Sequence, residues 1–182
     1  VPCIAFTSPK CGSVFSLRIA IVYSFILCLI CIYCLVILPL PTGEAAEQLL
    51  DRARKEEKQL LLQGEERSHL VCDRSWMREA LSNLIKNALD HTDSGGVIRV
   101  RWEESPAMLR IFVEDNGHGI PPEDIHFIFR RFYRSSRSSD REGCGLGLPL
   151  AKSVIEGQGG VIQVESRPGE GSRFIISFPG FG

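Results

Sequence analysis

The chain has 182 residues and a mass of 20.3 kDa, which allows one full domain with a short appendage and excludes two large domains. Lys and Arg total 21 and Asp and Glu total 22, so the net charge is −1, which argues against electrostatic capture of nucleic acid as the main function. Residues 1–43 differ from this average, because they contain Lys10, Arg18 and no acidic residue. The two parts therefore have separate interpretations.

An uncharged run of 20 residues, Ile19–Leu38, dominates the amino-terminal part. As a helix it would be about 30 Å long, which matches the hydrocarbon thickness of a bilayer, and Pro39 and Pro41 would end it. More basic residues follow the run than precede it, which predicts a single-pass protein of the cell membrane whose carboxyl-terminal domain is cytoplasmic. The chain begins with Val, so an alternative interpretation of residues 1–43 is a fragment or a mistranslated frame.

The sequence after residue 43 has the composition of a soluble protein. Residues 44–57 are charged and helix-prone, which predicts a linker or a lead-in helix, and residues 58–179 have the pattern of a folded domain. This domain is expected to begin with two short strands, Gln59–Gln63 and His69–Val71, with a turn between them.

A helix is expected from Arg74 to about His91, where a stretch rich in glycine then ends it. Its apolar stripe recurs every three to four residues and consists of Leu81, Leu84, Ile85 and Ala88. Its opposite side carries Glu79, Asn83, Asn87 and Asp90.

Two pairs of strands and a short helical turn complete the domain. Val97–Trp102 and Leu109–Glu114 are expected to pair in antiparallel orientation, followed by a helical turn at Glu123–Phe129. A last hairpin joins Val161–Ser166 to Arg173–Phe178 through a turn at residues 167–172. Helices and strands interleave but hairpins dominate, which predicts an α/β (α+β) two-layer sandwich with a mixed, mainly antiparallel sheet and helices on one face.

Asn83 and Asn87 are four residues apart, so both amides project from one side of the expected helix, between Glu79 and Asp90. Amide and carboxylate oxygens suit a magnesium ion that also binds the phosphates of a substrate. One such pair by itself also fits a solvated helix face.

A second polar motif, Asp115 to Gly119, follows directly after an expected strand. An ionised carboxylate at Asp115 only accepts hydrogen bonds, which suits an exocyclic amine such as that of adenine. Gly117 and Gly119 permit a positive φ and let a flat ring approach the backbone. The motif by itself also makes an ordinary turn.

A third motif, Gly143–Gly147, opens a helix that is expected to run to about Glu156. Bare backbone N–H groups at a helix start form a phosphate site, and the helix dipole adds to it. The apolar side of this helix is expected to consist of Leu150, Ala151, Val154 and Ile155.

Five arginines lie within residues 130–141, and Phe129, Phe132 and Tyr133 are interleaved with them. A nucleic-acid patch is one interpretation of this composition. A lid is favoured because the glycine-rich segment follows directly, so that the arginines would meet phosphate and the aromatic rings would pack the lid shut.

These motifs occur in one order within four longer stretches: Arg78–Thr92, Val113–Ile120, Ile128–Ser135 and Gly143–Lys152. Together they resemble the N box, first glycine box, F box and second glycine box of the ATP-binding catalytic domain of sensor histidine kinases. This domain is similar to those of DNA gyrase B, mismatch-repair ATPases and a heat-shock chaperone. The resemblance covers about two-thirds of the chain and implies a Bergerat-type ATP-binding fold, with ATP and Mg²⁺ as cofactors.

The resemblance also implies roles for single residues. Asn87, with Asn83, would hold Mg²⁺, and Asp115 would bind the adenine amine, with Ser172 nearby where the family usually has Thr. Arg134 would stabilise charge on the transferred γ-phosphoryl group, and Glu79 is the second catalytic candidate. The full set expected to bind ATP is Asn83, Asn87, Asp90, Asp115, Gly117, Gly119, Ile120, Phe129, Phe132, Gly143, Gly145, Leu146, Gly147, Leu148 and Ser172.

The phospho-acceptor histidine of the family is followed by Glu or Asp, whereas the four histidines of this chain precede Leu, Thr, Gly and Phe. The resemblance therefore implies that the substrate histidine lies on a dimerisation and phospho-acceptor hairpin outside this chain, and that a response regulator is a further partner. Autophosphorylation by this chain alone is not expected. Two alternatives remain open: a membrane-tethered nucleotide-binding module without kinase activity, and an anti-sigma-type serine kinase.

Overall fold

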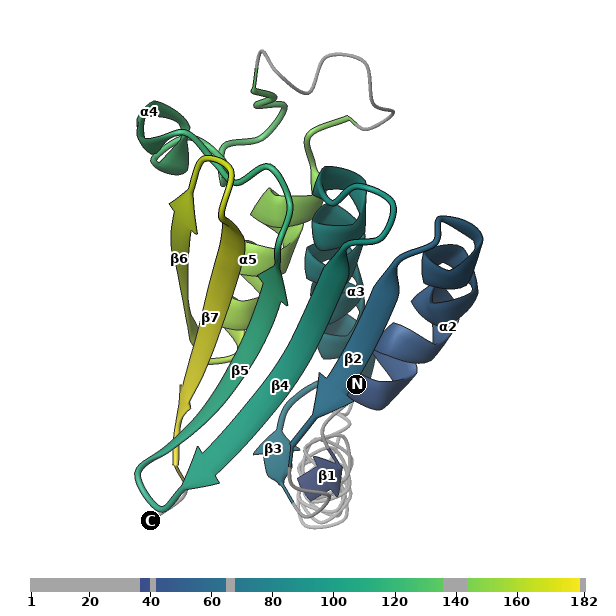
Figure 1. Ribbon diagram of the computed structural model, residues 1–182. Coiled ribbons are helices and arrows are strands. Elements are labelled where there is room, and N and C mark those ends of the chain that lie inside the picture. The colour runs from purple at the N-terminus through teal and green to yellow at the C-terminus, as the bar shows by residue number, and fades with distance from the viewer. Residues whose placement is uncertain (1–36, 40–41, 65–67, 136–143, 181–182) are drawn as a thin grey trace, which may run out of the picture. The chain divides into compact units, whose positions relative to one another are not determined.

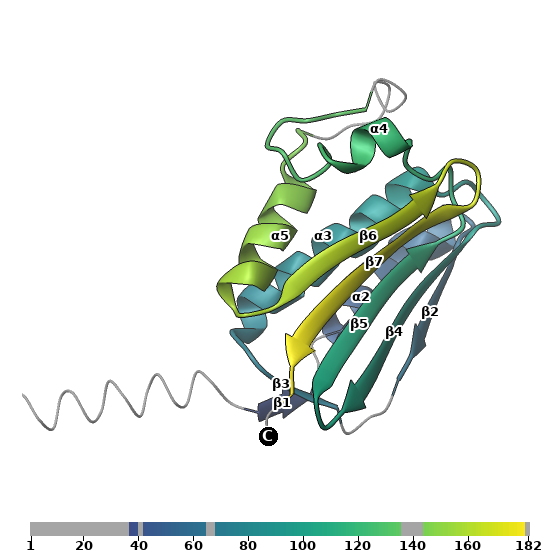
Figure 2. The same cartoon turned by 90° about the vertical axis from the view of Figure 1, so that its left-hand side faces the viewer.

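In the part of the chain that the structure describes, three helices lie on one face of a five-stranded sheet (Figures 1 and 2). The computed structural model describes residues 37–39, 42–64, 68–135 and 144–180. The covering helices are α2 (Thr42–Lys55), α3 (Arg74–His91) and α5 (Gly147–Gly157). A short helix, α4 (Pro122–Ile125), lies at the same end of the sheet as the turn between the last two strands (Figure 2).

The large sheet is mixed, with one parallel pair of strands and three antiparallel pairs. Its strands, in sheet order, are β2 (Gln59–Gln63), β4 (Val97–Ser105), β5 (Met108–Asp115), β7 (Gly171–Pro179) and β6 (Val161–Arg167). Only the β2–β4 pair is parallel among the described strands. A separate two-stranded sheet pairs β1 (Ile37–Pro39) with β3 (His69–Val71). The predicted α/β sandwich, with a mixed, mainly antiparallel sheet and helices on one face, is confirmed.

Helix α3 has the bounds that its sequence pattern predicts. The Asp73 carboxylate caps its first turn by accepting a hydrogen bond of 3.1 Å from the Trp76 backbone N–H. The predicted apolar stripe is confirmed, because all four side chains are fully buried. The periodicity of the apolar residues therefore correctly predicted which side of α3 faces the sheet and which side carries the polar residues.

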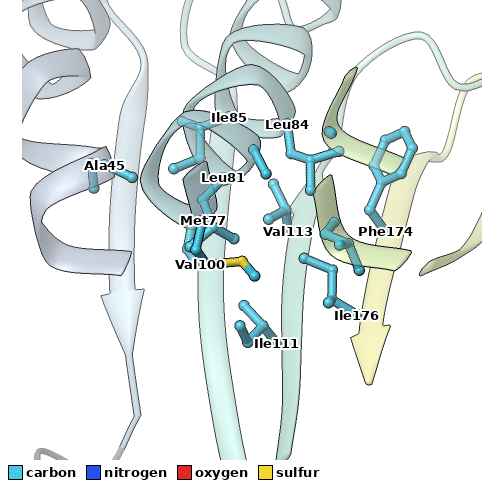
Figure 3. Packing of buried hydrophobic residues seen from close by; sticks show 14 of the residues in the cluster. Ala45, Met77, Leu81, Leu84, Ile85, Val100, Ile111, Val113, Phe174 and Ile176 are labelled. Atoms are coloured by element: carbon cyan, nitrogen blue, oxygen red, sulfur yellow. The ribbon is translucent and has the colours of Figure 1, made fainter. Parts of the chain in front are cut away.

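The core lies between α3 and the covered face of the sheet, and Figure 3 shows side chains from both meeting there. Helix α3 contributes Met77, Leu81, Leu84 and Ile85, and the strands contribute Val100, Ile111, Val113, Phe174 and Ile176. Each such side chain, when fully buried, contributes about 1.5 to 3 kcal/mol from the removal of apolar surface from water. This packing fixes the position of the end of β5 and the start of β7 relative to α3.

The bounds predicted for β2 and β3 are confirmed. The two strands belong to different sheets, because β2 lies beside β4 and β3 lies beside β1. One sequence expectation, on helix α5, needs correction. Leu150 does not belong to the buried side of α5, since it is 38% exposed while Ala151 and Ile155 are fully buried.

The predicted membrane helix lies almost entirely outside the described residues. Residues 19–36 lie outside the described part of the chain, and the last two residues of the predicted span, Ile37 and Leu38, belong to strand β1. None of the helices within the described ranges is long and apolar enough to cross a membrane. The charged segment after residue 43 forms most of helix α2.

Candidate nucleotide-binding site

The site is built around a row of polar side chains that crosses three strands. Asp115, the last residue of β5, pairs in register with Ser172 of β7, and Ser172 pairs with Ser166 of β6. Side chains alternate along a strand, so Asp115 points to the same face as the buried Val113. The row therefore lies on the helix-covered face of the sheet, at the end of its core.

Burial raises the pKa of the Asp115 carboxyl to about 6. Two hydrogen bonds, from the backbone N–H groups of Gly117 and Ser172, lower the pKa. The nearby His118 also lowers it. The Gly117 N–H lies 2.9 Å from Asp115 Oδ1. The carboxyl is therefore mostly ionised at pH 7, and a ligand that donates a hydrogen bond to it would stabilise its charge.

The loop after Asp115 is held against both α3 and the turn between β6 and β7. A Cβ on Gly117 would lie 2.0 Å from the backbone oxygen of His91, and a Cβ on Gly119 would lie 2.0 Å from that of Arg167. Gly119 also has a φ of +69°, so glycine is required there for space and for conformation. The two predicted glycines thus let the loop form one wall beside Asp115.

The polar side of α3 faces the start of α5. Asn83 donates from Nδ2 to the backbone oxygen of Glu79 at 2.9 Å and to Glu79 Oε1 at 3.2 Å. Its own Oδ1 is directed to the first residue of α5, since a Cβ on Gly147 would lie 3.2 Å from it. Asn87 is half-buried one turn further along the same side. The structure therefore brings the predicted metal ligands next to the predicted phosphate loop.

Asp90 forms an ion pair with Arg52 of helix α2. Its Oδ1 lies 2.5 Å from Nη2 of Arg52, and the Nε of Arg52 lies 2.6 Å from Glu56 Oε1. Asp90 therefore forms an ion pair that bridges two helices, a contact that the sequence pattern did not indicate.

The aromatic residues in the described part of the lid differ in burial. Phe129 packs edge-on against Phe174 of the core with ring centres 6.4 Å apart. Phe132 is 72% exposed and has a φ of +64°, so it does not pack the lid shut as predicted. The hydroxyl of Tyr133 donates to Asp124 Oδ1 at 2.6 Å, which ties the lid to α4.

The other predicted residues lie near this arrangement or outside the described ranges. Ile120 and Leu148 pack against the core, Leu146 is partly exposed before α5, and Arg134 is exposed on the lid. Gly145 accepts a backbone hydrogen bond from Phe132 at 3.0 Å, which joins the lid to the second glycine box. Gly143 lies outside the described residues.

A hollow of about 770 Å³ lies at this end of the sheet and is lined by Asp115, Ser166 and Ser172. It is also lined by Arg99, Glu114 and Arg173, which face the other side of the sheet, and by no residue of α3 or α5, so it does not outline the whole proposed site.

Ser166 is a site residue that sequence reasoning missed. The predicted turn at residues 167–172 is too long by three residues, because β6 extends to Arg167 and β7 already begins at Gly171. The correct register would have placed Ser166 opposite Ser172.

Known proteins resemble this chain over the same region. Residues 72–180 match the family described as histidine kinase-, DNA gyrase B- and HSP90-like ATPase. The alginate biosynthesis sensor protein KinB of Pseudomonas aeruginosa is 39% identical over 140 residues, which cover 77% of this chain and 22% of KinB. The sensor protein SrrB of Staphylococcus aureus is 38% identical over 109 residues, which cover 59% of this chain and 19% of SrrB. The chain thus spans about a fifth of the length of these curated relatives.

Solved structures agree with this assignment. The mycobacterial sensor histidine kinase MprB has a TM-score of 0.66 and 28% identity, and the match covers 80% of this chain and 98% of that one. The catalytic domain of the histidine kinase ThkA has a TM-score of 0.68 and 28% identity, and the match covers 76% of this chain and 90% of that one. The matched region contains Asp115, the glycine loops and the asparagine pair. This chain belongs to the family of histidine kinase-, DNA gyrase B- and HSP90-like ATPases.

Proposed function

We propose that residues 58–179 are the ATP-binding catalytic domain of a two-component sensor histidine kinase. In this proposal the domain transfers the γ-phosphoryl group of Mg-ATP to a histidine outside these 182 residues. The observation that carries the proposal is the buried carboxylate of Asp115, held by two backbone N–H groups beside a glycine loop. The relatives and solved structures that resemble the chain are sensor proteins and histidine kinases, which supports the same function.

The adenine end of the proposed site consists of Asp115, Ser172 and the loop at Gly117 and Gly119. An adenine amine can donate to the carboxylate, and the adenine edge also presents a ring nitrogen that accepts. Burial strengthens the hydrogen bond, because water does not compete for the carboxylate. Gly117 and Gly119 let the loop pack closely against the backbone of His91 and Arg167 beside Asp115.

The phosphate end consists of the start of α5 and the polar side of α3. The first N–H groups of α5 point toward its amino-terminal end, where the helix dipole favours phosphate. Asn83 and Asn87 would hold Mg²⁺ through their amide oxygens, and the metal would neutralise phosphate charge when bound.

The donor set of the described residues fits Mg²⁺ that keeps waters and phosphate oxygens. Within the described ranges no three His, Cys, Asp or Glu side chains gather as an all-protein metal site would require. Two amide oxygens one helical turn apart would supply part of a coordination shell, and waters and phosphate oxygens would complete it. Glu79 would keep the Asn83 amide turned, because its Oε1 accepts from Asn83 Nδ2.

Phosphoryl transfer in this site depends on position and charge. A nitrogen of the acceptor histidine would bond to the γ-phosphorus while the bond from that phosphorus to the β–γ bridging oxygen breaks, and ADP would leave. Arg134, on the lid, would stabilise the charge of the transferred group. The exposed position of Arg134 supports access to a substrate that approaches from another protein.

The whole protein would act in a signalling pathway. The histidine would lie on a dimerisation and phospho-acceptor hairpin, and a response regulator would receive the phosphoryl group. The uncharged run within residues 19–36 supports attachment to the cell membrane, with the catalytic domain in the cytoplasm.

Binding of a non-hydrolysable ATP analogue with Mg²⁺, measured by calorimetry on the full chain, tests the nucleotide site. Asp115→Asn keeps the shape of the side chain but removes its charge, and we expect it to weaken binding at least about tenfold. Asp51→Asn is the control, because Asp51 is an exposed carboxylate on α2 whose side chain is 83% accessible. Equal affinities of Asp115→Asn and the unsubstituted chain would contradict the proposal.

A second experiment separates the kinase from the two alternatives. The chain is incubated with labelled ATP and a separately prepared histidine-containing hairpin. Acid-labile, alkali-stable label on the hairpin supports the histidine kinase. Nucleotide binding without any label would favour the nucleotide-binding module, and acid-stable, alkali-labile label on a partner serine would favour the serine kinase.

A further inference from the structure

A groove of about 420 Å³ lies beside strand β6, at the edge of the sheet. Strand β6, helix α5 and the segment from α4 into the lid supply its lining. The apolar part of this lining consists of Ile125, Phe129, Ile162 and Val164. Phe129 is the one lining residue that belongs to the set expected to bind ATP, so most of the groove is separate from the proposed nucleotide site.

The outer edge of β6 is open to another strand. Among the described strands β6 is the last of its sheet, and Figure 2 views the sheet from that side, with β6 in front of β7. Its seven residues pair with β7 without a bulge, and it contains no proline. Bulges and prolines are common devices that stop an edge strand from pairing, and this edge has neither. Its charged residues, Glu165 and Arg167, lie on the uncovered face, away from the groove.

The groove is positively charged. Its polar lining contains His126, Arg130 and Lys152 and no Asp or Glu. The Nζ of Lys152 lies 5.0 Å from the centre of the Phe129 ring and 3.6 Å from Glu156 Oε1, and an exposed ion pair of this kind is weak. The chain as a whole has a net charge of −1, so the groove is a local concentration of basic groups. A partner that fits it carries negative charge.

We propose that β6 and the groove beside it bind an extended, acidic segment of a partner protein as an additional strand of the sheet. Hydrogen bonds between the two backbones would supply affinity, and the side chains of the segment would alternate between the two faces. One set would lie over the groove, where carboxylates would pair with Arg130 and Lys152. The other set would lie on the uncovered face beside Val161, which is 57% exposed.

Two other occupants fit this edge less well. Two copies of the chain paired through β6 would bring the basic groups of both grooves toward each other, and their repulsion would oppose the pairing. A nucleic acid has the required negative charge, but it has no strand backbone that could pair with β6. Both occupants are therefore outcomes that the test must distinguish from an acidic protein segment.

The test measures the binding of a fluorescent peptide to the full chain by fluorescence anisotropy, without nucleotide. The peptide has about eight residues and alternates Glu with Val, which favours an extended strand. A second peptide alternates Lys with Val. A third is the acidic peptide with proline in place of Val, which cannot form the strand ladder. Hydrogen exchange at the backbone amides of β6 locates the bound peptide.

Charge reversal in the groove supplies the matched comparison. Arg130→Glu combined with Lys152→Glu should weaken binding of the acidic peptide at least about tenfold. The control combines Arg54→Glu with Lys55→Glu, which changes the net charge equally on the exposed side of α2, beside the opposite edge strand β2. The control should stay within about twofold of the unsubstituted chain. If the groove variant does not fold, Arg130→Gln with Lys152→Gln replaces it, with an expected loss of at least about threefold.

The proposal is supported if the acidic peptide binds, protects the β6 amides, fails to bind in its proline form and is weakened by the groove variant alone. No binding of the acidic peptide overturns it, and so does equal binding of the acidic, basic and proline peptides or an equal loss in both charge variants. Equal competition by a single-stranded oligonucleotide also overturns it. Protection of the β6 amides that rises with protein concentration without peptide would assign the edge to a second copy and overturn it. Because no nucleotide is present, none of these results depends on the proposed ATP site.

Discussion

Gly147, the first residue of α5, lies directly against the side-chain amide of Asn83 on α3: a Cβ at Gly147 would be 3.2 Å from Asn83 Oδ1. This contact places the second glycine box beside the N box, although 64 residues separate them in the chain. The absence of a side chain at Gly147 therefore keeps the amide oxygen of Asn83 accessible beside the helix start.

Gly147→Ala should weaken binding of a Mg-bound ATP analogue about threefold to tenfold, because the new methyl group crowds the Asn83 oxygen. Gly157→Ala, at the other end of α5, is the matched control, since a Cβ there has no neighbour within 4 Å. Calorimetry measures both affinities. Equal affinities for the two variants would show that the Asn83 oxygen does not face the nucleotide.

The sequence was sufficient to predict the parts of the structure that a local pattern determines. Helix α3 has its predicted bounds because Asp73 caps its start and a single apolar stripe runs along it. The Asp115 motif and the glycine boxes were found because a few consecutive residues carry their chemistry. Local rules therefore located most of the candidate site before its geometry was known.

The parts that were missed depend on contacts between distant segments. The ion pair of Asp90 with Arg52 joins residues 38 positions apart, and no local pattern indicates it. The parallel pairing of β2 with β4 was missed because short strands do not specify their neighbour. Ser166 was missed because its role depends on the hairpin register with Ser172, which a shift in the turn alters.

Substitutions of Arg52 and Asp90 distinguish a structural role of Asp90 in the ion pair from its predicted role in ATP binding. Both side chains are more than a third exposed, so we expect Arg52→Gln to lower the free energy of unfolding by about 0.5 to 1 kcal/mol. We expect the same variant to leave ATP affinity within about twofold, because it removes no nucleotide contact. Urea unfolding and calorimetry give the two quantities.

Asp90→Asn completes this comparison. If Asp90 also binds the nucleotide, its substitution will weaken binding well beyond the effect of Arg52→Gln. Equal effects of the two substitutions on affinity would assign Asp90 to the helix–helix ion pair alone.

The backbone of Phe132 gives a prediction about stability. Its φ of +64° is a left-handed conformation that costs a residue with a Cβ about 1 kcal/mol, and its exposed ring recovers little of that by burial. Phe132→Gly should therefore unfold with a free energy about 1 kcal/mol higher than Phe132→Ala, measured in urea. Both variants lack the aromatic ring, so the difference between them isolates the cost of the backbone conformation at residue 132. A less stable Gly variant would contradict the left-handed assignment.

The raised pKa of Asp115 predicts how stability depends on pH without nucleotide. The carboxyl has a pKa of 3.8 in an unfolded chain and about 6 in the folded one. Between these values the folded state holds a proton that the unfolded state has lost, so the contribution of Asp115 to stability is fully present below about pH 4 and is lost as pH rises through 6. The full effect is about 3 kcal/mol as an upper value, at 1.36 kcal/mol per pKa unit.

The variant Asp115→Asn does not titrate, so its stability should lack this decrease between pH 4 and 6. The difference in unfolding free energy between the variant and the unsubstituted chain, measured in urea at pH 4.5, 5.5 and 7, isolates Asp115, because all other groups titrate in both proteins. A saturating ATP analogue should shift the decrease to lower pH, since the amine binds the ionised carboxylate more strongly than the protonated one. A difference that does not change with pH would mean that the Asp115 carboxyl keeps an ordinary pKa.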